Sequence, residues 1–132
     1  MKKILVIDDE NDILLSLKQG LEDTNGEIKV IAAKSGMECF EILKKGEKPD
    51  IILLDIMMPV MNGWEVLNRI RENPKWNNIP IVFLTAKNDD FTKTFGKSIA
   101  LDFIEKPFDL DDLKKKINYL LDKISKKGYF IE

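Results

Sequence analysis

Four short strand-like runs in this chain are each followed by a polar side chain that can do chemistry. The runs are largely apolar and β-branched, which is typical of strands buried in a parallel sheet. Carboxylates, a hydroxyl and an ammonium group in such places can bind a hard cation and neutralise an anionic substrate. The residues are Asp8 and Asp9 after Ile4–Ile7, Asp55 after Ile51–Leu54, Thr85 after Pro80–Leu84, and Lys106 after Asp102–Glu105.

These residue types point to phosphoryl chemistry supported by a divalent cation. Three carboxylates that share one crevice repel one another unless a cation lies among them. An all-oxygen site that also receives a phosphate oxygen suits Mg²⁺. Thr85 can donate a hydrogen bond and Lys106 a positive charge to a transferring phosphoryl group, while one carboxylate acts as nucleophile. The chain contains no His, so His-based zinc sites and His general bases are excluded.

Strand patterns and helix patterns alternate along the chain. A further strand is predicted at Lys29–Ala33, which makes five with the four runs above. Helical spacing of apolar residues, with breaks at glycine, asparagine and proline, predicts five helices. They are Asp12–Thr24, Ser35–Lys45, a helix with Trp64, Leu67 and Ile70 that ends near Asn73-Pro74, a weaker helix at Asp89–Ser98, and a last helix capped by Asp109.

Five such strand and helix units predict a doubly wound α/β fold, a flavodoxin-like three-layer sandwich around a parallel sheet. In open parallel sheets, ligands bind at the carboxyl ends of the strands, where the strand order reverses. With the order 2-1-3-4-5, this switch point lies between the first and third strands. We therefore expect Asp8, Asp9 and Asp55 to share one crevice, although nearly fifty residues separate them.

Composition limits the class of protein. The 132 residues are 44% hydrophobic and 33% charged, the balance of one globular domain. The formal net charge of −2 argues against a nucleic-acid-coating surface, and the polar side of the last helix carries Asp111, Asp112 and Asp122 beside its lysines, as a solvated face does. The single cysteine, Cys39, cannot form an internal disulfide, and there is no signal peptide or membrane span. We expect a cytoplasmic protein.

Four segments together resemble the signature of the response-regulator receiver domain of two-component signalling. They are Asp8-Asp9-Glu10, Asp55-Ile56-Met57-Met58-Pro59-Val60-Met61-Asn62-Gly63, Thr85-Ala86 and Lys106-Pro107-Phe108. The resemblance spans essentially the whole chain, with residues 1–127 as the receiver domain and 128–132 as a C-terminal tail. Val60 and Asn62 depart from the pattern, because Gly and Asp are common at these loop positions.

The resemblance implies a phosphoacceptor with a magnesium site. Asp55 is expected to accept the phosphoryl group and to bind Mg²⁺. Asp9 is expected to be a direct ligand, Asp8 a ligand mainly through water, and Met57 a ligand through its backbone carbonyl.

The resemblance also implies how phosphate is held and how the domain switches. Thr85 and Lys106 would contact phosphoryl oxygens, assisted by the backbone N–H groups of Met57 and Ala86. The Lys106-Pro107 bond would be cis, and Phe103 would be an aromatic switch residue together with Thr85. The face formed by the fourth helix, fifth strand and last helix would bind a downstream protein or a fused output domain.

The expected function is that of a signalling module whose only chemistry is its own phosphorylation and dephosphorylation. The donor would be a sensor histidine kinase or a phosphotransfer protein, and the module would be a monomer or a phosphorylation-dependent dimer, without direct binding to nucleic acid or membrane. One alternative is an adaptor that works without phosphorylation. Another is a phosphatase of the haloacid-dehalogenase type, but that class needs a second Asp two residues after the nucleophile, where this chain has Met57.

Overall fold

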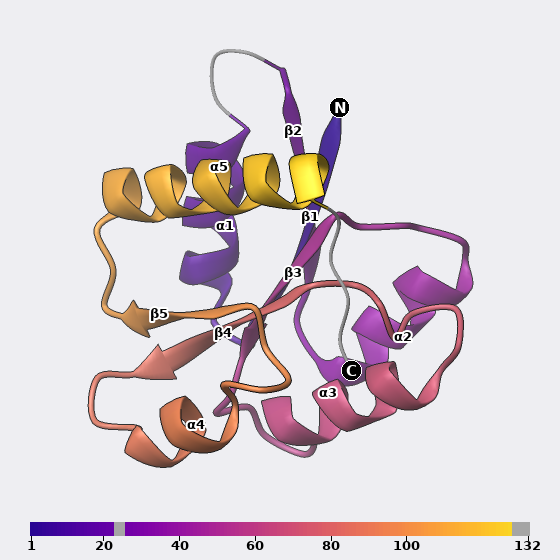
Figure 1. The fold of residues 1–132 in the computed structure, drawn as a ribbon. Coiled ribbons are helices and arrows are strands. Elements are labelled where there is room, and N and C mark those ends of the chain that lie inside the picture. Colours follow the sequence, from indigo (N-terminus) through magenta and orange to yellow (C-terminus); the bar gives the residue numbers. More distant parts are fainter. Residues whose placement is uncertain (23–25, 128–132) are drawn as a thin grey trace.

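A computed structural model describes residues 1–22 and 26–127 of the chain (Figure 1). Its centre is a sheet of five parallel strands in the order β2-β1-β3-β4-β5. The strands are β1 (Lys2–Ile7), β2 (Ile28–Ala33), β3 (Ile51–Asp55), β4 (Ile81–Ala86) and β5 (Asp102–Lys106). The predicted fold class and strand order are therefore confirmed.

Five helices cover the two faces of the sheet (Figure 1). Because β1, β3 and β4 are central, their side chains are buried on both faces, and two separate apolar cores result. One core lies under α1 and α5, and the other under α2, α3 and α4. The helices are α1 (Asn11–Leu21), α2 (Gly36–Lys44), α3 (Gly63–Glu72), α4 (Asp90–Phe95) and α5 (Leu110–Lys127).

Several predicted element bounds need correction. Pro80 lies outside β4, whereas Thr85 belongs to the strand rather than to the loop after it. Asp55 and Lys106 are likewise the last residues of β3 and β5. These three polar residues continue the strands because their backbone groups join the parallel ladders, whatever the polarity of the side chain.

Two of the predicted helices extend beyond the observed ones at both ends. Ser35 is the N-cap of α2, with its hydroxyl accepting a hydrogen bond from the N–H of Glu38, and Lys45 is its C-cap. α4 is the shortest helix, because Gly96 caps it and the chain then turns, with the N–H of Ala100 bonded to the carbonyl of Gly96.

The predicted cap of the last helix is confirmed. The carboxylate of Asp109 accepts a hydrogen bond from the N–H of Asp112, at 3.1 Å. The predicted end of the first helix at Thr24 and the predicted tail at 128–132 lie outside the described residues. Within the described residues, the helices are too short or too polar to cross a bilayer.

Candidate functional site

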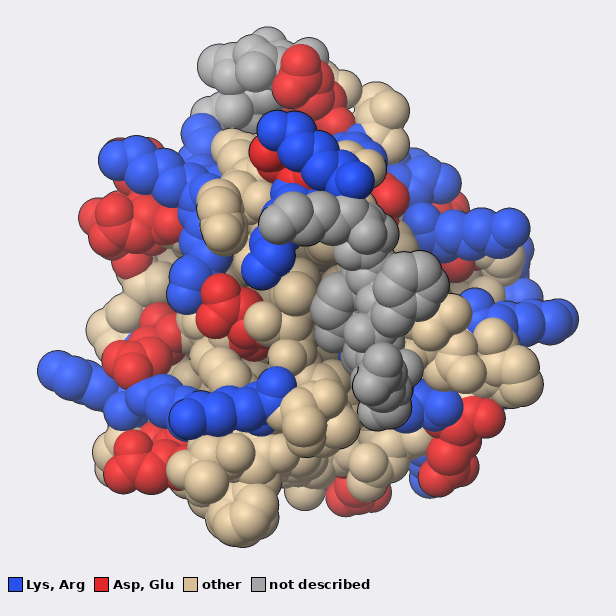
Figure 2. Space-filling model, in the orientation of Figure 1, with Lys and Arg blue, Asp and Glu red and all other residues tan. Residues whose placement is uncertain are grey.

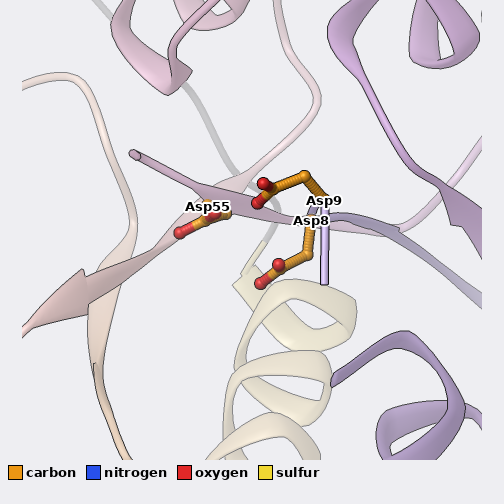
Figure 3. A group of neighbouring side chains, drawn as sticks. All are labelled: Asp8, Asp9 and Asp55. Carbon is orange, nitrogen blue, oxygen red and sulfur yellow. The ribbon is translucent and has the colours of Figure 1, made fainter. Parts of the chain in front are cut away.

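Three aspartates meet at the carboxyl ends of β1 and β3. Ile7 pairs with Leu54 in the ladder between these strands, so Asp8 and Asp55, the next residue of each, lie side by side. One carboxylate oxygen from each of Asp8, Asp9 and Asp55 lies within 4.8 Å of the others (Figure 3). The predicted shared crevice is therefore confirmed.

The three carboxylates differ in their surroundings. Asp8 is fully buried and Asp55 is 5% exposed, whereas Asp9 lies open to solvent. Both oxygens of Asp8 are engaged: Oδ1 accepts the N–H of Glu10 at 2.9 Å and Oδ2 accepts the ammonium group of Lys106 at 2.6 Å. Asp8 is thus fixed in place, and Asp9 can reach a ligand that arrives from solvent.

Lys106 carries positive charge into this crevice from the end of β5. Besides Asp8, its Nζ atom donates to Asp55 Oδ1 at 3.2 Å. Burial alone lowers the pKa of Lys106, but the hydrogen bond to Asp8 and the charges of Asp55 and Asp8 outweigh burial, so its pKa lies above the usual value. Lys106 therefore stays charged at any physiological pH.

The surroundings of Asp55 disfavour the ionised form of its carboxyl group. Burial, followed by the negative charge of Asp8, raises the pKa of Asp55 to about 6, although Lys106 opposes this shift. A second cation would relieve the remaining repulsion. The donors are all oxygens and include three carboxylates, which is the chemistry that a hard divalent ion such as Mg²⁺ requires. The residues therefore fit the predicted metal.

Thr85 lies near the carboxyl end of β4, directly after Leu84, the residue that pairs with Asp55. Its side chain is 1% exposed, and its hydroxyl has no hydrogen-bond partner among the described residues. In β4 it neighbours Ala86, which pairs with Lys106 in the ladder between β4 and β5. A buried hydroxyl without a partner is costly, so this group is available to a ligand in the crevice.

The loop after β3 is shaped by a close backbone approach. The N–H of Gly63 bonds to the carbonyl of Ile56, and a Cβ atom on Gly63 would lie 2.5 Å from the carbonyl oxygen of Asp55. Only glycine fits there. In the same loop Val60 has φ +67° and is fully exposed. Gly is common at this loop position in the receiver signature, which is a sign of a positive φ. The sequence analysis noted the departure at Val60 but did not predict the strained backbone.

The remaining predicted residues lie in the loop after Asp55, directly after Lys106, and on β5. Met57, two residues after Asp55, has a 76% exposed side chain. The Lys106-Pro107 bond is cis. Phe103 is half-buried on β5, and its ring stacks on Phe83 with centroids 6.2 Å apart. The roles of the Met57 and Ala86 backbones toward metal and phosphate stay predictions.

The chain belongs to the response regulator receiver domain family, whose model matches residues 4–118. Receiver domains are the phosphoacceptor modules of two-component signalling. Protein PilH of Pseudomonas aeruginosa is 32% identical, with 92% of this chain and 98% of PilH covered. The alkaline phosphatase synthesis regulator PhoP of Bacillus subtilis is 39% identical over 91% of this chain but 48% of PhoP.

Solved structures agree with the fold and the family. A CheY-like receiver domain protein from Methanospirillum hungatei superimposes with a TM-score of 0.79 at 32% identity, covering 96% of this chain and 98% of that one. Vibrio cholerae CheY4 gives a TM-score of 0.81 at 30% identity, covering 90% and 98%. The chain spans about half or less of several curated relatives, such as a probable cyclic di-GMP phosphodiesterase of Vibrio cholerae at 27%.

Proposed function

We propose that Asp55 is the phosphoacceptor of this receiver domain and that its donor is a sensor histidine kinase or a phosphotransfer protein. The observation that carries the proposal is the position of the Asp55 carboxylate. One of its oxygens lies within 4.8 Å of oxygens of Asp8 and Asp9, and its Oδ1 accepts a hydrogen bond from Lys106 at 3.2 Å. In the sheet Asp55 pairs with Leu84, and the next residue, Thr85, has a buried hydroxyl without a partner among the described residues.

The geometry favours Asp55 over Asp8 as nucleophile. Asp8 uses one oxygen for the N–H of Glu10 and the other for Lys106. Asp55 shares only Oδ1 with Lys106 among the described residues, which leaves Oδ2 for attack. This oxygen would form a bond to phosphorus while the phosphorus–nitrogen bond of a phosphohistidine donor breaks, and the donor imidazole keeps the electron pair and takes up a proton.

The other groups bind and neutralise the transferred group. Lys106 and Thr85 would each hold a phosphoryl oxygen, with the backbone N–H groups of Met57 and Ala86 beside them. Asp8, Asp9, Asp55 and the Met57 carbonyl would hold Mg²⁺, which supplies positive charge between the carboxylates and the phosphoryl oxygens. The chemistry is directed only at the domain itself, so the chain acts as a signalling module rather than as an enzyme on other substrates.

The output surface would be the α4-β5-α5 face. A groove of about 560 Å³ lies there, lined among others by Lys93, Phe103, Glu105 and Lys116. If Thr85 moves toward the phosphoryl group, the space it vacates can admit the Phe103 ring, which would change this groove. We propose that the groove binds a downstream protein or a fused output domain. The receiver domain itself would be a monomer or a phosphorylation-dependent dimer.

The charge pattern supports a protein partner rather than nucleic acid. Basic and acidic side chains are both present over the face that Figure 2 shows, with red side chains next to the blue ones. We propose that the module works in the cytoplasm, where histidine kinases present their phosphoryl groups.

The test is phosphorylation by a small acyl phosphate in Mg²⁺ buffer, followed by intact-mass analysis. One added phosphoryl group is expected in the parent protein and none in Asp55→Asn or in excess chelator. A phosphoryl group that persists in Asp55→Asn would overturn the assignment. A parent that stays unmodified while it still binds a partner would favour the phosphorylation-independent adaptor.

The proposed switch has a separate structural test. Structures with and without a beryllium fluoride mimic should show Thr85 drawn toward the site and the Phe103 ring turned inward. Identical positions of both residues would leave Phe103 as a core residue only.

A further inference from the structure

Helix α4 rests on a row of three aromatic rings contributed by α3, β4 and β5. The rings of Trp64 and Phe83 lie 5.3 Å apart between centroids, and those of Phe83 and Phe103 lie 6.2 Å apart. The Phe103 ring reaches beneath the end of α4, because a Cβ atom on Gly96 would lie 3.0 Å from it. A change at Phe103 must therefore be accommodated by α4.

Trp64 ties α4 to this row by a hydrogen bond as well as by packing. Its indole N–H donates to the hydroxyl of Thr92 at 3.3 Å, and its ring meets Phe91 edge-on at 6.0 Å. Thr92 is 1% exposed, so its hydroxyl faces the protein interior. Trp64 stands in the first turn of α3, directly after the loop that follows Asp55.

A second link holds α4 through Lys93, which is more exposed than its neighbour Thr92. Lys93 pairs with the carboxylate of Glu105 on β5, and its ammonium group also donates to the carbonyl of Lys87 at 3.0 Å. Exposed ion pairs contribute little. The bond to the buried Thr92 hydroxyl is the better restraint, because a buried polar group without a partner carries a desolvation cost.

We propose that Trp64 is a positioning residue of the switch: its hydrogen bond to Thr92 holds α4 in the arrangement of this structure and so opposes phosphorylation. This inference rests on the proposed phosphoacceptor role of Asp55. If phosphorylation favours a second arrangement of α4, then removing a bond present only in the first raises the population of the second. A hydrogen bond of ordinary net strength changes that ratio about fivefold.

Two near-conservative variants each remove the bond. Thr92→Val keeps the volume of the buried side chain and deletes the acceptor, and Trp64→Phe keeps an aromatic ring and deletes the donor. The matched controls are Thr94→Val, an exposed threonine on the same helix, and Trp76→Phe, a half-buried tryptophan that stacks on Phe40 instead.

The readout is the initial rate of phosphorylation by a small acyl phosphate at fixed Mg²⁺, followed by intact mass. Each of the Trp64 and Thr92 variants should react about fivefold faster than the parent, the double variant no faster than either, and the controls at the parental rate. Simple loss of stability does not accelerate phosphorylation, so a structural role alone cannot give this result.

Two outcomes would overturn the inference itself. Single variants that react at the parental rate or more slowly would show that the bond does not oppose phosphorylation. Multiplying effects in the double variant would show that the two residues act separately. If Trp64→Phe does not fold, the phosphorylation rate of Thr92→Val alone tests the inference. A parent protein that is never phosphorylated would instead overturn the proposed function, and this inference with it.

Discussion

The ammonium group of Lys106 and the fully buried carboxylate of Asp8 form an ion pair 2.6 Å long, across 98 residues of sequence. In the sheet, β3 and β4 lie between the strands that carry them. Lys106 therefore stabilises the structure described here, in addition to its proposed contact with a phosphoryl oxygen. Without Lys106, the buried carboxylate of Asp8 would have no cation beside it.

Replacing this lysine should therefore weaken the fold. Lys106→Gln is expected to lower the free energy of unfolding by about 3 kcal/mol in chelator, since it leaves a buried carboxylate unpaired. Added Mg²⁺ should restore part of the loss by supplying positive charge. Urea denaturation measures both effects. The control is Lys116→Gln, whose partially exposed pair with Asp102 should contribute little; equal losses in the two variants would contradict the argument.

The raised pKa of Asp55 predicts how stability depends on pH when no metal is added. The carboxyl group has a pKa of about 6 in the folded chain and an ordinary value of 3.8. Between these values the folded state holds the proton that the unfolded state releases, so this group makes stability fall as pH rises. The penalty is complete about one pH unit above the folded-state pKa, where it is about 3 kcal/mol.

Asp55→Asn removes this penalty. In chelator its free energy of unfolding should equal that of the parent at about pH 3, exceed it increasingly as pH rises, and keep a constant advantage above about pH 7. Mg²⁺ should stabilise the parent more than the variant. Denaturation at several pH values checks this, with the exposed Asp111→Asn as control for general charge. An advantage that does not change with pH would contradict the assignment.

Val60 is expected to be a site where substitution stabilises the chain. A β-branched residue at φ +67° is strained, and a fully exposed side chain loses no packing when it is replaced. Val60→Asn should raise the free energy of unfolding by about 1 kcal/mol. Val60→Ile, which keeps the branched side chain, should give no gain in thermal or urea denaturation. If both variants behave alike, backbone strain is not the cause.

The lifetime of the phosphorylated form should depend on Met57 and Lys87. Both are exposed, and they follow Asp55 and Thr85 by two residues. Neither can orient a water for attack on the acyl phosphate, because Met offers no suitable hydrogen bond and a charged Lys accepts no proton. Met57→Asn with Lys87→Glu should therefore speed hydrolysis by about tenfold.

Loss of the phosphoryl group in Mg²⁺ buffer, followed by intact mass, measures this rate. Lys48→Glu makes the same charge change at an exposed position in the segment before β3 and should leave the rate unchanged. A double variant that hydrolyses no faster than the parent would show that other groups control the lifetime.

The crevice could be predicted from sequence because its residues mark the ends of buried strands. The apolar runs before Asp8 and Asp55 identify central parallel strands. In a sheet with this strand order, the carboxyl ends of these two strands lie side by side at the point where the order reverses. Thr85 was expected directly after the strand Pro80–Leu84, but it lies inside β4. Its backbone joins the ladder, which side-chain polarity does not reveal.

Tertiary contacts of side chains could not be predicted in the same way. The helical spacing of Trp64 with Leu67 and Ile70 predicts only that Trp64 faces inward from α3. Its bond to Thr92 depends on where the short α4 ends, and that end is set by the turn at Gly96. The pairing of Lys106 with Asp8 depends similarly on how far one long side chain reaches across the sheet edge.

The separation of Asp8 from Lys106 has a consequence during synthesis on the ribosome. The N-terminal strands emerge first, so the acidic crevice is encoded long before the residue that neutralises it. A nascent chain that has not yet released β5 from the exit tunnel carries the aspartates without their lysine. If Asp55 accepts the phosphoryl group as proposed, competence to receive a signal therefore arrives late, with the last strand of the sheet.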